Sequence, residues 1–148
     1  MEWENCEIRL IQKRQITVQT DNTMYILGTD HFVITTKNLE ACLRFYTETL
    51  GMESKETNER FSLRFGSRKI NIHTRPAEFL PAAAHPLAGS LDLCFEIEDD
   101  IEVALAELKG KNAPLVTDIV ERNGAKGKIR SIYLRDPDGN LIELASYG

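Results

Sequence analysis

An internal repeat constrains the fold of this chain more than any other feature. Residues 28–34 (GTDHFVI) align weakly with residues 89–95 (GSLDLCF), 61 positions later. Around each stretch the same patterns recur in the same order: a β-branched apolar run, a helical run and three short strand-like runs. Each half therefore predicts a β-α-β-β-β unit.

Capping and turn residues set the predicted boundaries. In the first half, Asn38 is expected to cap a helix that Gly51 ends, with strands at 25–36, 52–57, 60–65 and 69–74. In the second half, Asp99 or Asp100 caps a helix that Gly110 ends, with strands at 90–97, 115–120, 128–134 and 141–145. Residues 121–128 are expected to form a flexible hairpin loop and residues 136–139 (DPDG) a tight turn.

A four-stranded sheet covered by one helix leaves its other face open until a second unit meets it. Two such units, in one chain or across a dimer, would enclose a cleft between their sheets. The predicted class is thus α+β, with two βαβββ modules forming a cup-shaped mixed sheet. We assign residues 1–24 to an N-terminal arm and residues 25–148 to the domain, with module one at about 25–75 and module two at about 89–147.

Composition narrows the classes of function. The net charge of −5 gives no reason to expect the basic surface that sequence-independent nucleic-acid binding needs. No apolar run approaches the roughly 20 residues of a membrane span. Three cysteines without CxxC spacing do not indicate a disulfide framework, so the predicted location is the cytoplasm.

Side chains alternate across a strand, so each predicted strand presents one apolar and one polar face. The polar faces of four strands carry one potential metal ligand each: His31, His73, Asp92 and Glu143. Two imidazoles and two carboxylates suit divalent zinc, nickel, cobalt, manganese or iron. The alternative is an open sheet whose polar face simply meets water, as half-buried strands often do.

Four stretches carry a resemblance to a known superfamily. They are residues 30–53 (DHFVITTKNLEACLRFYTETLGME), 68–73 (RKINIH), 83–99 (AAHPLAGSLDLCFEIED) and 131–144 (SIYLRDPDGNLIEL). Through them the chain resembles the vicinal oxygen chelate superfamily of glyoxalase I, extradiol dioxygenases, and fosfomycin and bleomycin resistance proteins. It looks closest to small single-domain glyoxalase-like members.

The resemblance implies paired βαβββ modules around one divalent metal ion, with ligands from the first and last strand of each module. His31 matches the first-strand histidine and Glu143 the final-strand glutamate. Asp92 stands where a second histidine is usual, and either His73 or Asn71 occupies the acidic position of the first module. His73 is the better donor, so it completes the predicted ligand set.

In such a site the metal acts as a Lewis acid that stabilises an oxyanion or enediolate of a small oxygen-bearing substrate. For a glyoxalase-like lyase or isomerase, Glu143 and then Asp92 are the candidate catalytic bases, although each could be a fixed ligand. The alternatives are a ring-cleaving dioxygenase with ferrous iron, a non-catalytic drug or metabolite binder, and a transferase that adds a thiol to an epoxide antibiotic. A homodimer that binds a small-molecule substrate is expected.

Other residues allow two interpretations. His85 either packs within its Ala/Pro-rich loop or closes over a substrate. Three cations either hold an anionic substrate or lie on a solvated face: Arg64, Lys128 and Arg130. Four aromatic residues either line the cleft or pack in the core: Phe61, Phe65, Phe79 and Tyr133.

Overall fold

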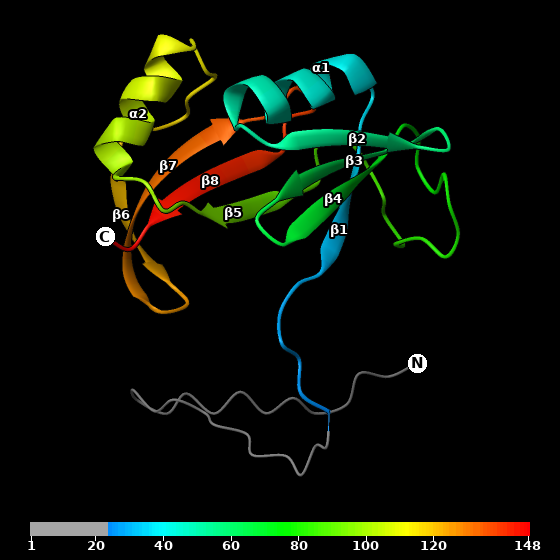
Figure 1. Ribbon diagram of the computed structural model, residues 1–148, viewed down its shortest axis with the longest axis horizontal. Coiled ribbons are helices and arrows are strands. Elements are labelled where there is room, and N and C mark those ends of the chain that lie inside the picture. The colour runs from blue at the N-terminus through cyan, green and yellow to red at the C-terminus, as the bar shows by residue number, and fades with distance from the viewer. Residues whose placement is uncertain (1–23) are drawn as a thin grey trace, which may run out of the picture.

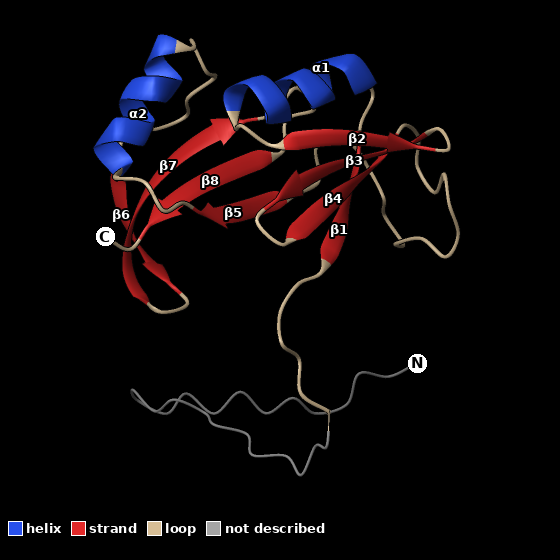
Figure 2. Ribbon diagram, in the orientation of Figure 1, coloured by secondary structure: helices blue, strands red, loops and turns tan. Residues whose placement is uncertain are grey.

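The computed structural model describes residues 24–148 as two four-stranded sheets with both helices on the same side of them (Figures 1 and 2). The strand orders are β1-β4-β3-β2 and β5-β8-β7-β6, so the second sheet repeats the topology of the first. In each sheet the first and last strands pair in parallel, and the other neighbours are antiparallel. The predicted α+β class with two βαβββ modules is confirmed. The predicted N-terminal arm lies outside the described residues, apart from Met24.

The elements divide into two modules. Module 1 contains β1 (His31–Thr35), α1 (Leu39–Arg44), the π-helical segment η1 (Phe45–Thr49), β2 (Glu53–Thr57), β3 (Arg60–Phe65) and β4 (Arg68–His73). Module 2 contains β5 (Asp92–Glu96), α2 (Ile101–Gly110), β6 (Val120–Gly124), β7 (Gly127–Arg135) and β8 (Leu141–Ser146). With 10 residues, α2 is too short to cross a bilayer, and so is every other helix within residues 24–148.

The predicted helix caps are confirmed. The side chain of Asn38 accepts a hydrogen bond from the Ala41 amide at 3.0 Å, which satisfies one of the free donors of the first turn of α1. Asp100, rather than Asp99, caps α2 by accepting from the amides of Glu102 and Val103.

Three predicted boundaries are wrong. Residues 115–119 form only an isolated bridge, between Leu115 and Leu134, while Leu115 and Ile119 pack against the core without a regular strand and Val120 already belongs to β6. Residues 121–128 form the predicted hairpin, but β6 and the start of β7 pair through them, so only Ala125 and Lys126 make the turn. A sheet-edge strand needs no apolar run, since most of the β6 side chains meet solvent. In the first module β1 begins at His31, not at residue 25, because its partner β4 begins at Arg68.

The core lies between the helices and the apolar faces of the sheets. Ile34, Leu63 and Ile70 are fully buried in module 1, and Ile132 and Ile142 in module 2. Aromatic rings join the modules: Phe95 of β5 lies 6.3 Å from Phe32 of β1 and 5.2 Å from Phe65 of β3, between ring centroids. We call the opposite face of each sheet, turned away from the helices, its open face.

A buried polar network also joins the modules. Asp136, in the turn before β8, accepts hydrogen bonds from the hydroxyl of Tyr46 at 2.8 Å and from the side-chain amide of Asn140 at 2.7 Å. Asn140 in turn accepts from the Leu91 amide ahead of β5. Burial and the Asp136 charge raise the pKa of Tyr46, so this hydroxyl remains a donor. The DPDG turn is therefore a structural connection between the two halves.

Candidate functional site

The open face of module 2 carries the two predicted carboxylates close together. Glu143 of β8 pairs with Cys94 of β5 on one side and with Tyr133 of β7 on the other, so the three side chains form a row. Asp92 lies two residues before Cys94 and therefore on the same face, displaced by about 7 Å along the strand. Both carboxylates can reach a common ligand above this face.

Cys94 contributes no reactive thiolate to this row. Burial, followed by the charge of Glu143, raises its pKa to about 11. The pKa of Tyr133 is also raised, chiefly by burial, so both groups stay protonated at neutral pH. Glu143 thus has a protonated thiol and a protonated phenol as neighbours.

The two predicted histidines lie on the open face of module 1 but far from one another. His31 pairs with Lys69, whereas His73 pairs with Thr35, four residues further along β1. Four residues of strand span about 13 Å, and metal–nitrogen bonds are only about 2 Å long. His31 and His73 of one chain therefore do not share a metal ion.

The strand register also resolves the choice between His73 and Asn71. In the internal repeat Val33 corresponds to Cys94. Val33 pairs with Asn71 as Cys94 pairs with Glu143, so Asn71 is the structural counterpart of Glu143. An amide oxygen is a weaker ligand than a carboxylate for zinc or iron, which leaves module 1 with His31 as its main donor.

Within residues 24–148, no three histidine, cysteine, aspartate or glutamate side chains come close enough to hold a metal ion. The four predicted ligands do not fit one ion within a single chain. His31 nevertheless has the arrangement of a metal ligand, because its Nδ1 lies 2.6 Å from Oδ1 of Asp30. A carboxylate on one ring nitrogen orients the ring and leaves Nε2 for a metal or substrate.

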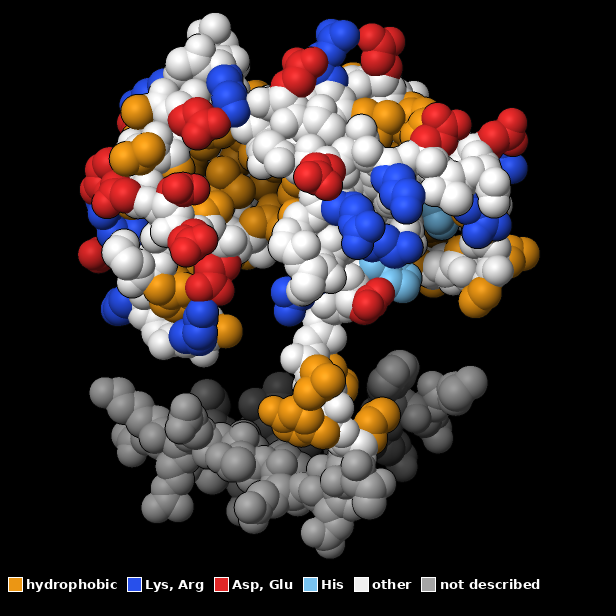
Figure 3. All heavy atoms as spheres, in the orientation of Figure 1, with side chains coloured by type: hydrophobic (Ala, Val, Ile, Leu, Met, Phe, Trp, Pro, Cys, Tyr) orange, Lys and Arg blue, Asp and Glu red, His pale blue; other side chains and the backbone are white. Residues whose placement is uncertain are grey.

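A cleft of about 900 Å³ opens over the same face of module 1. Its floor contains Ser62 and Asn71, and five cationic side chains surround it: Lys55, Arg60, Arg64, Arg68 and Lys69. Asp30 is the one carboxylate that lines it. In Figure 3 blue side chains gather over this part of the molecule, while red ones predominate over module 2.

An aromatic wall closes one side of the cleft. Phe79, from the loop after β4, stacks under the guanidinium of Arg60 at 4.1 Å and meets the ring of His73 edge-on at 5.0 Å. Glu78 fixes this loop by accepting hydrogen bonds from the Thr74 amide at 2.7 Å and hydroxyl at 3.1 Å. These bonds lower the pKa of Glu78, the amide having the larger effect. The wall is thus held in position before any ligand arrives.

The remaining candidates have separate places. His85 is exposed in its loop, and Arg130 pairs with Glu102 of α2, away from the cleft. Phe61 and Phe65 both pack against the core, and Phe61 and Phe79 lie along the cleft. Sequence reasoning singled out Arg64 but missed the other four cations: Lys55, Arg60, Arg68 and Lys69. The alternation rule applied to charges, as it was to apolar residues, would have placed Lys55, Arg60 and Lys69 on the same face as Arg64.

Comparisons with known proteins identify the family. The model of the Glyoxalase/Bleomycin resistance protein/Dioxygenase superfamily matches residues 28–144. The chain belongs to this superfamily. The described βαβββ modules agree with that assignment, and the resemblance noted from the sequence is confirmed.

Related proteins cover most of the chain. This chain is 43% identical over 125 residues to the virulence protein STM3117 of Salmonella typhimurium, and the match covers 84% of this chain and 87% of that protein. The crystal structure of STM3117 matches with a TM-score of 0.81, covering 84% of this chain and all of that one (100%). The glyoxalase domain-containing protein RDO1 of Mycosarcoma maydis is 44% identical over 137 residues, 92% of this chain and 73% of that one. The integron cassette protein VCH_CASS1 from the mobile metagenome of V. cholerae is 38% identical, with a TM-score of 0.80, covering 84% of this chain and 98% of that one.

Proposed function

We propose that the chain is a metal-dependent, glyoxalase-like lyase or isomerase that works as a homodimer on a small oxygen-bearing substrate. One observation carries this proposal: the donors on the two open faces complement each other but do not meet within one chain. Module 1 supplies the exposed imidazole of His31, and module 2 supplies Asp92 and Glu143. Placing module 1 of one subunit against module 2 of another brings one nitrogen and two oxygen donors together.

This donor set suits a divalent ion such as zinc, nickel, cobalt, manganese or iron. When bound, the ion would polarise a substrate oxygen. Asp30 orients the imidazole of His31 through its Nδ1. Glu143 accepts a proton from the carbon beside that oxygen, and Asp92 is the second candidate for this role. His73, which is remote from His31, faces the substrate cleft instead.

A non-catalytic binder is the second candidate, and the cleft itself favours it. Cations and aromatic rings dominate its lining, and such a lining can retain a ligand without transforming it. A ring-cleaving dioxygenase has less support, because a two-histidine, one-carboxylate iron site would need His31 and His73 together. We also propose a cytoplasmic location, since Cys42 and Cys94 are both free thiols.

A mixed dimer tests the arrangement directly. His31→Ala and Glu143→Ala chains are co-expressed with different tags, and the heterodimer is purified through both. If each site combines His31 of one subunit with Glu143 of the other, one site carries both substitutions and the other is intact. The heterodimer should then bind about half the metal of the wild type, measured by elemental analysis, whereas each homodimeric variant binds almost none.

The control is His85→Ala, which removes an exposed histidine outside the site and should keep full metal content. A heterodimer as empty as its parents would show that the sites do not form between subunits. Wild-type protein that takes up no divalent metal would exclude the enzyme and leave the binder. Turnover of a glutathione hemithioacetal and of a catechol then separates the lyase from the dioxygenase.

A further inference from the structure

The cations of the cleft are concentrated on one face of the sheet. Arg64 of β3 is directly paired with Lys69 of β4, a like-charge pairing that destabilises the sheet, and on its other side with the carboxylate-bearing Glu53 of β2. The chain as a whole is acidic, with a net charge of −5, so a basic composition does not explain the cluster. None of the ion pairs within residues 24–148 involves a lysine or arginine of the cleft.

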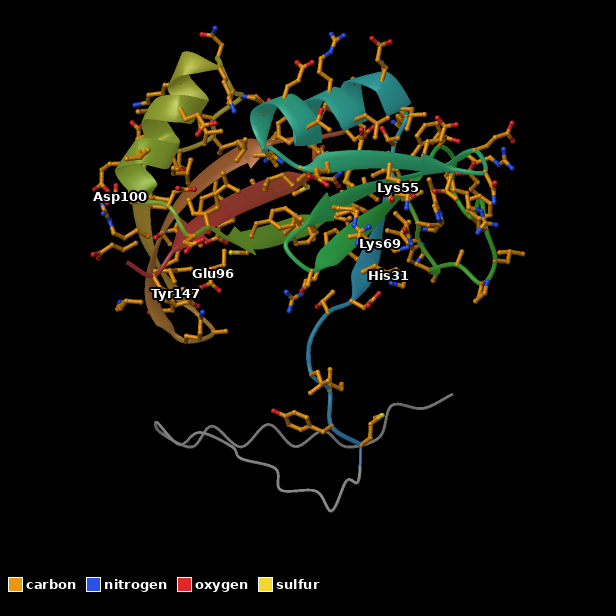
Figure 4. All side chains as sticks on the ribbon, viewed as in Figure 1. His31, Lys55, Lys69, Glu96, Asp100 and Tyr147 are labelled. Carbon is orange, nitrogen blue, oxygen red and sulfur yellow. The ribbon has the colours of Figure 1, made fainter. Side chains whose placement is uncertain are left out.

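Two cations of the cleft lie in the same row of the sheet as the proposed metal donor His31. His31, Lys69 and Arg64 are consecutive partners across β1, β4 and β3, so they form one row on the open face. Lys55 lies on β2, paired with Ser62 of the cleft floor. Figure 4 shows Lys55, Lys69 and His31 on the same part of the sheet.

The geometry points to a small organic dianion as the ligand of this cleft, either a phosphate ester or a dicarboxylate, with an apolar body. Arg64, Lys69 and Lys55 bind the anionic group through charge-assisted hydrogen bonds. The apolar part lies against Phe79, beside the guanidinium of Arg60 that this ring already holds. The inference deepens the proposed function by naming its substrate class and rests on it in that respect, but the residues involved are not the metal donors.

The charge pattern favours a small ligand over an acidic surface of a partner subunit as the principal occupant. On the open face of module 2, Glu96 is already paired with Lys126 at 2.7 Å, and Asp92 and Glu143 are assigned to the metal ion. Few free carboxylates then remain to neutralise five cations. A concave cleft of about 900 Å³ also suits a small molecule, because such sites commonly have this size.

Calorimetric titration of the full-length protein tests the inference, with phenyl phosphate and phthalate as probes at low ionic strength. At least one probe should bind saturably, and the one that binds identifies the anionic group. Arg64→Gln and Lys69→Gln should each weaken binding about tenfold, as expected for loss of a charge-assisted hydrogen bond. The matched control is Arg44→Gln on α1, which carries the same charge change outside the cleft and should alter binding less than about twofold.

Two further measurements keep the inference separate from the proposed function. Protein stripped of metal with a chelator should still bind the probe, because the cations and not the metal hold the anionic group. The melting temperature of ligand-free Lys69→Gln should not fall, since the change relieves its like-charge pairing with Arg64. That of Arg64→Gln should change little, since this variant loses the like-charge pairing with Lys69 and the opposite-charge pairing with Glu53 together. Light scattering should show an unchanged oligomeric state for both variants. Lys55→Gln serves as an independent variant if either of these fails to fold.

Several results would overturn the inference. One is the absence of saturable binding of either probe to the wild type. Another is an equal loss of affinity in Arg44→Gln, which would indicate only general electrostatic attraction. If the probe no longer binds after removal of the metal, and if Arg64→Gln and Lys69→Gln leave its affinity unchanged, the anion binds to the metal ion and not to the cations. Dissociation of the dimer in the cleft variants would show that the cations serve the subunit interface.

Discussion

The two modules share one topology and yet present opposite charges on their open faces. Module 1 carries Lys55, Arg64 and Lys69 over its sheet, whereas module 2 carries Asp92 and Glu143 at the corresponding faces of β5 and β8. The apolar positions that face the helices repeat, since Ile34 and Ile70 have counterparts in Phe95 and Ile142. The comparison shows that packing fixes the repeated fold, while the outward-facing positions can take different chemistry without altering it.

The turns before the last strands differ as much as the faces do. In module 1, the turn between β3 and β4 is exposed at Gly66 and Ser67. In module 2, the equivalent turn contains Asp136, which is 5% exposed and bonded to Tyr46 of module 1 and to Asn140. One turn only reverses the chain, whereas the other ties the two modules together.

The largest effect that this comparison predicts is that of Asp136→Ala. The substitution leaves the buried hydroxyl of Tyr46 and the amide of Asn140 without their acceptor, so the free energy of unfolding should fall by about 3–5 kcal/mol. Urea denaturation followed by circular dichroism measures it. Tyr46→Phe removes one bond of the same network and should cost about 1–2 kcal/mol.

Ser67→Ala in the turn of module 1 is the matched control and should change stability by less than about 0.5 kcal/mol. If Asp136→Ala were as mild as Ser67→Ala, the two turns would be equivalent after all.

A second contrast concerns the glycines that precede the first strand of each module. A methyl group added at Gly89, whose φ is +75°, would lie 2.4 Å from the carbonyl oxygen of Asp138, a backbone atom that cannot move aside easily. At Gly28 the nearest atom is the end of the flexible Arg68 side chain, at 3.3 Å. Gly89→Ala should therefore cost about 2–4 kcal/mol and Gly28→Ala less than about 1 kcal/mol.

Thermal unfolding of the two glycine variants, side by side, checks this expectation. Similar melting temperatures for both would contradict the assignment of Gly89 to a position that only glycine can occupy.

The sequence predicts most of the fold because local signals and packing agree. The sequence itself shows the capping residues Asn38 and Asp100, the alternation in β5 and β8, and the repeat. It does not show the edge strand β6. This strand pairs with a single neighbour and most of its side chains meet solvent, so it has no apolar periodicity. Edge strands lack the burial that makes other strands recognisable.

The candidate site was less predictable, because alternation gives the face on which a residue lies but not the register of paired strands. Alternation predicted that His31 and His73 lie on the same face. Only the pairing of His73 with Thr35 shows that their positions differ by four residues along β1. A shift of two residues keeps the face and moves the side chain by about 7 Å, enough to exchange Asn71 for His73 beside the site. The cluster around Lys69 depends on the same register across three strands.

The smallest effect concerns the hairpins that begin the antiparallel part of each sheet. Between β2 and β3, Asn58 and Glu59 both have positive φ, 51° and 60°, as a two-residue turn of the type favoured in hairpins requires. Glutamate tolerates this conformation poorly, so Glu59→Gly should raise the free energy of unfolding by about 0.5–1 kcal/mol. The hairpin between β6 and β7 has Ala125 and Lys126 at its tip, with no positive φ at either. Ala125→Gly should therefore bring no gain, and a shift of the urea midpoint upward for Glu59→Gly alone would show that backbone strain is confined to the hairpin of module 1.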